Sequence, residues 1–302
     1  MAENEELKPE ESPKSDEQSK KPSTLEEAIL SSKLPEGMKT FASAADAICE
    51  RRSVRKYKEA AMINPLEVAL INEIVSNFKP TLGNIHIEIS LLPRADFEKH
   101  FKVDEFTPNA PFFLIFMAEE DPYAGFEVGR LGQRVALNLC AVGTGTCFLD
   151  TPPTKDTSLP LPYALTLAFG EARKSNVRDK AKANRKQYEA LVYNEHGLIF
   201  KDFSNSQLRT MDAGRYAPSA FNRQLWRFVP ERNAIHLWEK KPSFGERKKL
   251  SVRDGVEMGI VAENMSLRAA QVGEVENAGA VFKTDDYEIN LKGCKYWASV
   301  IA

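Results

Sequence analysis

Two stretches of this 302-residue chain are similar to one another, and this internal repeat limits the folds that the chain can adopt. Residues 125–143 read GFEVGRLGQRVALNLCAVG, and residues 255–273 read GVEMGIVAENMSLRAAQVG. In both stretches apolar residues recur at i, i+4, i+8 and i+11, which predicts two helices that bury the same face. The equivalent apolar positions are Leu131, Val135, Leu139 and Val142 in the first stretch and Val261, Met265, Ala269 and Val272 in the second.

Two further pairs of similar segments follow the same order along the chain. KPTLGNIHIEI, from residue 79, matches APSAFNRQLWR, from residue 217, in its proline, hydroxyl and asparagine positions. PYALTLAFG, from residue 162, resembles the terminal YWASVIA, from residue 296. Three ordered matches favour a degenerate duplication over the alternative, a chance likeness between two amphipathic helices. A duplicated unit usually packs against its copy about a pseudo-two-fold axis, as the subunits of a homodimer do.

The remaining segments alternate between helical and strand patterns, so we expect a fold of the α+β class. Apolar residues recur at helical spacing over residues 41–48. Asn64 followed by Pro65 is typical of a helix start, with an asparagine cap and a proline at the first helical position. Residues 85–92 alternate as a half-buried strand does, whereas FFLIFMA, residues 112–118, is a continuous apolar run of strand length.

These patterns predict two degenerate repeats that form an intramolecular pseudo-dimer. Residues 39–186 make up the first half and residues 187–302 the second, and residues 1–38 precede them as an acidic, lysine-rich tail. Residues 1–22 contain no Val, Ile, Phe, Trp or Tyr, so this segment cannot bury enough apolar surface to offset the entropy lost on ordering. We therefore expect the tail to be disordered.

Composition argues against several classes of protein. The formal net charge of -2 is unlike that of a dedicated nucleic-acid binder, which carries a positive excess. No apolar run is long enough to predict a membrane span, and the N-terminus is acidic where targeting peptides are basic, so we expect a cytoplasmic protein. The four cysteines form no CxxC pair and the four histidines lack ligand spacing, so we expect reduced thiols and no metal site.

The segment ERRSVRKY, residues 50–57, gathers three arginines and a lysine around one serine directly after the first predicted helix. In a chain of nearly neutral net charge, this cluster indicates a local anion site. The alternative is a solvated basic patch at a helix end, where arginine favours the negative end of the helix dipole. The second half offers HGLIFKDF, residues 196–203, which keeps Lys201 but has neither arginine nor serine.

The Pro-Ser-x-x-Asn-x-Gln motif shows the opposite asymmetry between the halves. It is intact in the second half, whereas the first half keeps only its proline, a threonine and an asparagine, and has a histidine at the glutamine position. Hydroxyl and amide side chains after a proline turn suit recognition of the edge of a heterocycle, although an ordinary polar turn is the alternative. The intact motif is Pro218, Ser219, Asn222 and Gln224, and its eroded counterpart is Pro80, Thr81, Asn84 and His86.

Two further segments occur only in the first half. EARKSNVRDKAKANRK, residues 171–186, holds seven basic residues against two acidic ones. It is either a solvated linker between the halves or a source of anion ligands, and a role at an RNA or membrane surface is disfavoured because no aromatic residue interleaves it. GTGTCFLD, residues 143–150, follows the first of the two repeated helices.

Three of these segments together resemble the signatures of the FMN-dependent nitroreductase family. AICERRSVRKY, from residue 47, is similar to the opening signature, APSAFNRQLWRF, from residue 217, to the second, and GTGTCFL, from residue 143, to the third. The duplication suggests the subgroup in which two nitroreductase halves are fused in a single-chain tandem pseudo-dimer. The resemblance implies a nitroreductase fold of the α+β class, with FMN held between the two halves.

The resemblance also implies which residues hold FMN, whose phosphate carries a charge of about -1.5 to -2 and suits the planar fork of arginine. Residues implied near the phosphate and the adjoining ring edge are Arg51, Arg52, Ser53 and Arg55, joined by Arg178, Lys182 and Arg185 of the basic segment. Residues implied at the flavin ring are Leu149 and Asp150, through a backbone N–H near N5, and Pro218, Ser219, Asn222 and Gln224 from the second half.

The losses in the two halves are complementary, so we predict one complete FMN site per chain. The family resemblance implies an FMN-dependent NAD(P)H oxidoreductase that reduces nitroaromatics, quinones or a similar acceptor. FMN carries the redox chemistry, so we predict no catalytic side chain, and the lack of a GxGxxG motif predicts that NAD(P)H binds transiently. The alternative is a non-catalytic flavin-binding protein on a decayed scaffold. We expect a monomer that acts as a pseudo-dimer, with no nucleic-acid or membrane partner.

Overall fold

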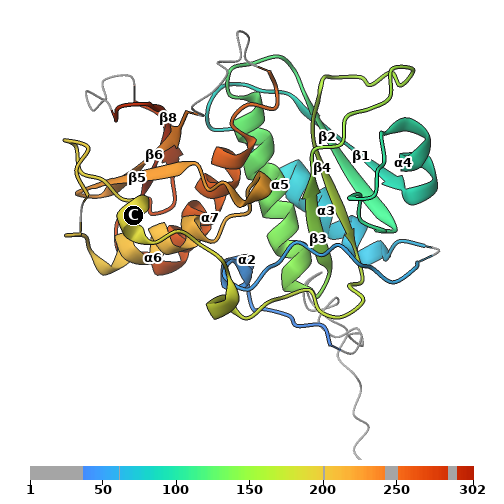
Figure 1. The fold of residues 1–302 in the computed structure, drawn as a ribbon, viewed down its shortest axis with the longest axis horizontal. Coiled ribbons are helices and arrows are strands. Elements are labelled where there is room, and N and C mark those ends of the chain that lie inside the picture. Colours follow the sequence, from blue (N-terminus) through green and yellow to red (C-terminus); the bar gives the residue numbers. More distant parts are fainter. Residues whose placement is uncertain (1–36, 61, 200, 242–250, 285–290) are drawn as a thin grey trace, which may run out of the picture.

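The computed structural model describes residues 37–60, 62–199, 201–241, 251–284 and 291–302. Two antiparallel four-stranded sheets lie on either side of a central pair of helices, α5 (Ala124–Ala141) and α7 (Val256–Val272) (Figure 1). This mixed arrangement of helices and antiparallel strands agrees with the predicted α+β class. Residues 1–36 of the predicted tail lie outside the described residues.

The first sheet has the strand order β1-β2-β4-β3, with every neighbouring pair antiparallel. The predicted start of α3 is confirmed, because the Asn64 side chain accepts a hydrogen bond from the backbone N–H of Leu66 at 3.0 Å. The apolar run at 112–118 forms β2 and is buried along its whole length. The other elements of this half are α2 (Ala44–Ala47), α3 (Pro65–Asn77), β1 (Ile87–Pro93), α4 (Arg94–His100), β3 (Gly145–Leu149), β4 (Tyr163–Gly170) and a 3₁₀ turn at Lys180–Lys182.

The second sheet has the order β5-β6-β8-β7 and is also antiparallel. Both sheets therefore run first, second, fourth, third strand, and in both a long helix connects the second strand to the third. The two repeated stretches of sequence are these two long helices, as predicted. The remaining elements are a 3₁₀ turn at Tyr188–Ala190, α6 (Asn205–Arg215), a 3₁₀ turn at Ala220–Asn222, β5 (Trp226–Glu231), β6 (Ala234–Lys240), β7 (Val281–Phe282) and β8 (Cys294–Ile301).

Helices α5 and α7 pack closely because glycine occupies equivalent positions on both. A Cβ atom added to Gly129 would lie 2.1 Å from the carbonyl oxygen of Val256, and one added to Gly259 would lie 1.8 Å from that of Phe126. These contacts are reciprocal, since 259 - 129 and 256 - 126 both equal 130. In a contact between two-fold-related surfaces, residue i touches j and the copy of j touches the copy of i.

Polar side chains in the same helix pair repeat this reciprocity. Gln133 donates a hydrogen bond to Asn264 at 2.6 Å, and Arg134 forms an ion pair with Glu263 at 2.5 Å. At the offset of 130, Gln133 is the counterpart of Glu263 and Arg134 that of Asn264. One amide pair and one ion pair thus occupy equivalent places in the contact between α5 and α7.

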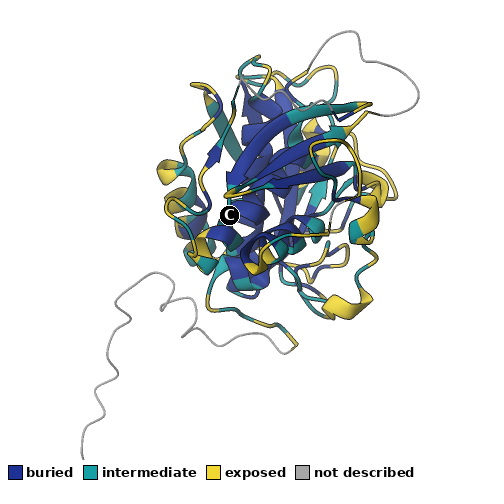
Figure 2. Ribbon diagram, turned by 90° about the vertical axis from the view of Figure 1, so that its left-hand side faces the viewer, coloured by how far each residue is buried: buried dark blue, intermediate teal, exposed yellow. Residues whose placement is uncertain are grey.

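The largest apolar core of each half shares the partly buried residues Tyr123, Phe148 and Val256 with that of the other. Phe126 of α5 is fully buried in the core of the second half, where its ring stacks on that of Trp297 with centroids 6.0 Å apart. Figure 2 shows buried residues concentrated in the sheets and central helices, and exposed residues in the outer loops. The helix pair is therefore fixed by packing on both sides, which in turn fixes the loops at its ends.

Candidate functional site

The ERRSVRKY segment leaves α2 as extended chain and lies against two other segments of the first half. Arg51 forms a backbone bridge with Val177, and Ser53 forms one with Thr146 in β3. The N–H of Val54 donates to the carbonyl oxygen of Thr146 at 2.9 Å. Three segments singled out from the sequence, ERRSVRKY, GTGTCFLD and the basic segment, therefore converge at one end of the first sheet.

Arg51 is buried beneath this junction and has no carboxylate partner among the described residues. Its side chain is 5% exposed and donates to Thr146 Oγ1 at 3.0 Å, and its guanidinium lies 5.7 Å from the centre of the Phe148 ring. Burial lowers the pKa of Arg51, because a charged guanidinium loses hydration there. Within the described ranges the guanidinium donates only to neutral oxygen acceptors and lies near a ring, so no negative charge there compensates its positive charge.

Arg178 and Arg185 of the basic segment lie near Arg51, and these three residues are called the arginine cluster below. Burial, followed by the charges of Arg178 and Arg51, lowers the pKa of Arg185 to about 10. Burial and then the charge of Arg51 also lower the pKa of Arg178. The Nε atoms of Arg178 and Arg185 are buried without a hydrogen-bond partner in the described part of the chain.

The like charges of the arginine cluster thus lower the free energy of unfolding of the protein unless an anion binds to them. Buried or half-buried cations repel one another in a medium of low polarity, and each unpaired N–H retains its desolvation cost. A phosphate would remove both costs, because it brings negative charge and several acceptor oxygens. The geometry therefore fits an oxyanion.

The intact motif of the second half meets the arginine cluster through Arg185. The Arg185 guanidinium donates to Asn222 Oδ1 at 3.1 Å and to the carbonyl oxygen of Tyr216 at 3.0 Å. Gln224 is buried, and its Oε1 accepts a hydrogen bond from the N–H of Lys186 at 2.8 Å. Side chains and backbone of residues 185–186 and of the 219–224 segment are therefore brought together.

The loop that carries this motif, residues 219–224, is held in an unusual conformation. Phe221, Asn222 and Gln224 have φ values of 51°, 56° and 51°, in the left-handed region that non-glycine residues rarely adopt. Ser219 Oγ accepts a hydrogen bond from the N–H of Gln224 at 3.1 Å and so closes the loop. Backbone strain of this kind is concentrated at binding sites, where surrounding contacts enforce it.

Other residues proposed from the sequence lie around this centre. Arg52 and Arg55 are exposed, although the charge of Arg52 still contributes to lowering the pKa of Arg178. Lys182 lies on the exposed turn at 180–182, and no described contact joins it to the arginine cluster. Pro218 is half-buried and precedes the strained loop.

Leu149 and Asp150 stand at the end of β3. Leu149 pairs with Thr166 in the first sheet, and the exposed Asp150 carboxylate forms an ion pair with Arg253 of the second half. Thr146 was not among the predicted residues, although it supplies the hydroxyl that orients Arg51. The signal in the sequence that could have identified Thr146 is its position within the GTGTCFLD segment, residues 143–150.

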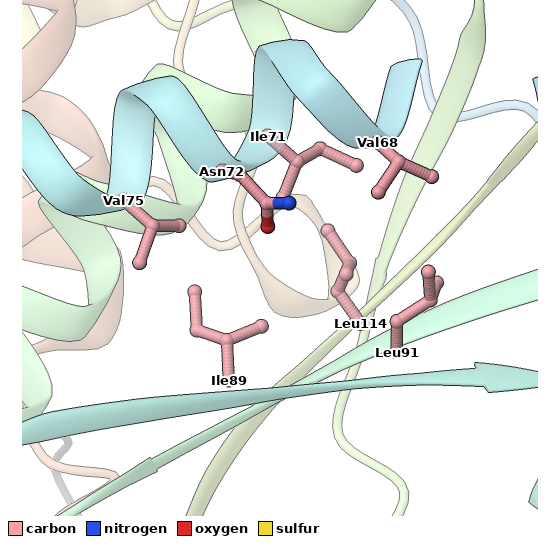
Figure 3. Close-up of a pocket in the computed structure, with 7 residues that line it drawn as sticks. All are labelled: Val68, Ile71, Asn72, Val75, Ile89, Leu91 and Leu114. Carbon is pink, nitrogen blue, oxygen red and sulfur yellow. The ribbon is translucent and has the colours of Figure 1, made fainter. Parts of the chain in front are cut away.

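A cavity of about 110 Å³ lies away from the arginine cluster, between α3 and strands β1 and β2 (Figure 3). Its lining is mostly apolar and comprises Val68, Ile71, Asn72, Val75, Ile89, Leu91 and Leu114. The described residues include no group of three His, Cys, Asp or Glu side chains placed to hold a metal ion. Within the same residues, no helix has the length and apolar character needed to cross a bilayer.

The cysteines are free thiols, and burial raises the pKa of Cys140 to about 12. Cys140 therefore stays protonated near neutral pH and lacks the thiolate that a nucleophile requires.

Comparison with known proteins identifies the kinship of this fold. The family model described as "Putative TM nitroreductase" matches residues 44–269. A nitroreductase structure from Thermotoga maritima covers 86% of this chain and 93% of its own, with a TM-score of 0.57 and 19% identity. Its likeness shows that the two chains share a fold over nearly their whole length.

Two smaller relatives match about half of the chain. A nitroreductase from Desulfovibrio desulfuricans, crystallised with FMN, covers 55% of this chain and 100% of its own at 18% identity and a TM-score of 0.38. An FMN-dependent nitroreductase from Clostridium difficile R20291 covers 45% and 92% at 13% identity and a TM-score of 0.36. No curated protein sequence matches the chain.

Proposed function

The chain belongs to the nitroreductase family, and from this premise we propose that it is an FMN-dependent NAD(P)H oxidoreductase that reduces nitroaromatics, quinones or a related electron acceptor. The observation that carries the proposal is the arginine cluster, which has no carboxylate partner among the described residues and contacts Asn222 of the second half through Arg185. An oxyanion and an adjoining polar ring edge are the two features of FMN that such a site would recognise.

The residues present fit FMN at its phosphate end. The unpaired Nε atoms of Arg178 and Arg185 are donors that lack an acceptor, and the phosphate supplies acceptor oxygens together with about -1.5 to -2 units of charge. Arg51 would add its charge from below, where Thr146 and Phe148 fix its orientation. Exposed Arg52 and Arg55 would contribute at the rim, and Lys182 only at longer range.

The second half would hold the isoalloxazine edge. Asn222 and Gln224 offer amide donors and acceptors that reach ring nitrogens and carbonyls, and Ser219 keeps their loop closed. Ser53, Leu149 and Asp150 would line the opposite side from the end of β3. When bound, FMN accepts a hydride from a nicotinamide and passes electrons to the acceptor, so the side chains need only bind and orient it.

We further propose that the chain is a tandem pseudo-dimer with one FMN site, made of halves 39–186 and 187–302. The matching strand orders, the reciprocal glycine contacts and the equivalent polar pairs of the central helices support this. The first half has Thr81, Asn84 and His86 at the positions equivalent to the Ser219–Gln224 loop. An exposed histidine there replaces the glutamine of the motif. A monomer would then suffice for activity.

Spectroscopy of the purified protein tests this proposal. Protein incubated with FMN and desalted should keep the flavin absorbance near 450 nm, and NADPH or NADH should bleach it. Retained flavin that neither nucleotide bleaches would instead indicate a non-catalytic flavin-binding protein. Protein that retains no FMN would falsify both functions.

A further inference from the structure

Glu257 joins the central helix of the second half to the strained loop of the candidate flavin site. It lies in the first turn of α7, and its Oε1 accepts a hydrogen bond from the backbone N–H of Ala220 at 2.7 Å. Its side chain is 19% exposed, and the Arg223 guanidinium approaches the same oxygen at 3.6 Å. The carboxylate therefore lies beneath the loop and holds it through a backbone atom, whatever side chains the loop presents.

The same contact occurs in the first half. Glu127, the counterpart of Glu257 at an offset of 130, accepts hydrogen bonds from the backbone N–H groups of Leu82 at 2.9 Å and Thr81 at 3.1 Å. Leu82 is the counterpart of Ala220 in the matched motifs, since 220 - 82 equals the motif offset of 138. A carboxylate in the first turn of each long helix thus fixes the loop after the proline of its own half.

Only the second half uses this anchor on an intact motif. Between Ala220 and Gln224 the backbone adopts left-handed angles at three non-glycine residues, and such angles persist only when neighbouring contacts enforce them. The bond from Ala220 is charge-assisted, and bonds of that kind are shorter and stronger than neutral ones. Glu257 is the one described side chain that accepts a hydrogen bond from the Ala220 N–H.

We propose that Glu257 is a positioning residue that holds the Ser219–Gln224 loop in the conformation that presents Asn222 and Gln224 to the flavin, and that Glu127 is its counterpart in the half whose motif has decayed. This inference rests on the proposed flavin site, which it extends to a residue that does not itself touch the ligand. Glu127 provides an internal control, because it anchors the equivalent loop of the first half.

Three variants test the role: Glu257→Ala, Glu257→Gln and Glu127→Gln. Titration of each FMN-free protein, followed by quenching of flavin fluorescence, should show affinity about tenfold weaker for Glu257→Ala. Glu257→Gln should recover most of it, since its amide oxygen still accepts the bond from Ala220. Glu127→Gln should bind FMN as the wild type does. Wild-type affinity in Glu257→Ala would overturn the proposal while leaving the flavin site in place.

Hydrogen exchange provides a readout that does not depend on the flavin. In the FMN-free protein, peptides spanning residues 219–224 should exchange faster in Glu257→Ala than in the wild type, and peptides spanning residues 80–84 should not change. Unchanged exchange at 219–224 would refute the anchoring role. If the wild type binds no FMN, the proposed function is wrong. Faster exchange at 219–224 in Glu257→Ala would still show that Glu257 anchors the loop.

Discussion

Replacing Gly259 by alanine is expected to push the two central helices apart. The added Cβ would lie 1.8 Å from the carbonyl oxygen of Phe126 and 2.9 Å from the backbone nitrogen of Arg130. An unstrained C···O contact is about 3.3 Å long, so the backbones would have to separate by roughly 1.5 Å. Backbone atoms in a packed helix cannot turn aside as the end of a side chain can.

The cost follows from this displacement. Overpacking of a core typically costs about 1–3 kcal/mol, and a clash between two backbones belongs at the upper end, about 3 kcal/mol. Alanine recovers about 1 kcal/mol of helix propensity relative to glycine. The net loss is about 2 kcal/mol, which lowers Tm by about 3 °C in a 302-residue protein, because its entropy of unfolding is about 0.6 kcal/mol/K.

The reciprocal glycine gives a second, independent measurement. Gly129→Ala should cost a similar amount, because its Cβ would lie 2.1 Å from the carbonyl oxygen of Val256. The double variant should lose less than the sum, since helices that have separated for one methyl group already have room for the other. Gly132→Ala, on the same helix as Gly129, is the control: its nearest neighbour is the flexible end of Leu165 at 3.1 Å, so we expect little or no loss.

Urea denaturation followed by tryptophan fluorescence and circular dichroism measures all four variants. Midpoints for Gly129→Ala and Gly259→Ala should fall together and well below that of Gly132→Ala. Wild-type midpoints for these two variants, or an equal loss in Gly132→Ala, would refute the close reciprocal packing of α5 and α7.

Three further predictions concern the site and its surroundings. Arg178→Met should weaken FMN binding about tenfold but raise the melting temperature of the FMN-free protein, because a half-buried charge beside Arg51 is removed; scanning fluorimetry with and without FMN measures both. Asn222→Ala should weaken FMN binding whereas Lys201→Ala should not, and loss in both variants would defeat the assignment. Burial raises the pKa of Glu67, so as pH rises from about 4.5 the unfolded chain releases this proton before the folded protein does, and the free energy of unfolding falls. Between pH 4 and pH 7 the urea midpoint of Glu67→Gln should therefore fall less than that of the wild type.

Local patterns in the sequence predicted the elements whose formation depends on local chemistry. Asn64 and Pro65 marked the start of α3 because a side-chain cap and a fixed φ act within one turn. The run at 112–118 predicted β2 because a strand buried on both faces needs no polar positions. The repeat at an offset of 130 identified the two central helices, and with them the glycines at their seam.

Contacts between distant segments were beyond the reach of those patterns. The sequence could not distinguish among Arg178, Lys182 and Arg185, because spacing in irregular chain does not say which side chain turns inward. In the structure Arg178 and Arg185 lie near Arg51, and Lys182 is exposed. Glu257 was visible only as a position shared with Glu127. Its bond to Ala220 depends on how α7 meets a loop 37 residues earlier in the chain.

Calorimetric titration of the FMN-free chain with FMN tests the division of one flavin site between two halves most directly. We predict a stoichiometry of one FMN per chain, and we predict that Arg185→Met in the first half and Asn222→Ala in the second each weaken that same binding event. Two FMN molecules per chain, or a single site that responds to only one of these substitutions, would contradict it.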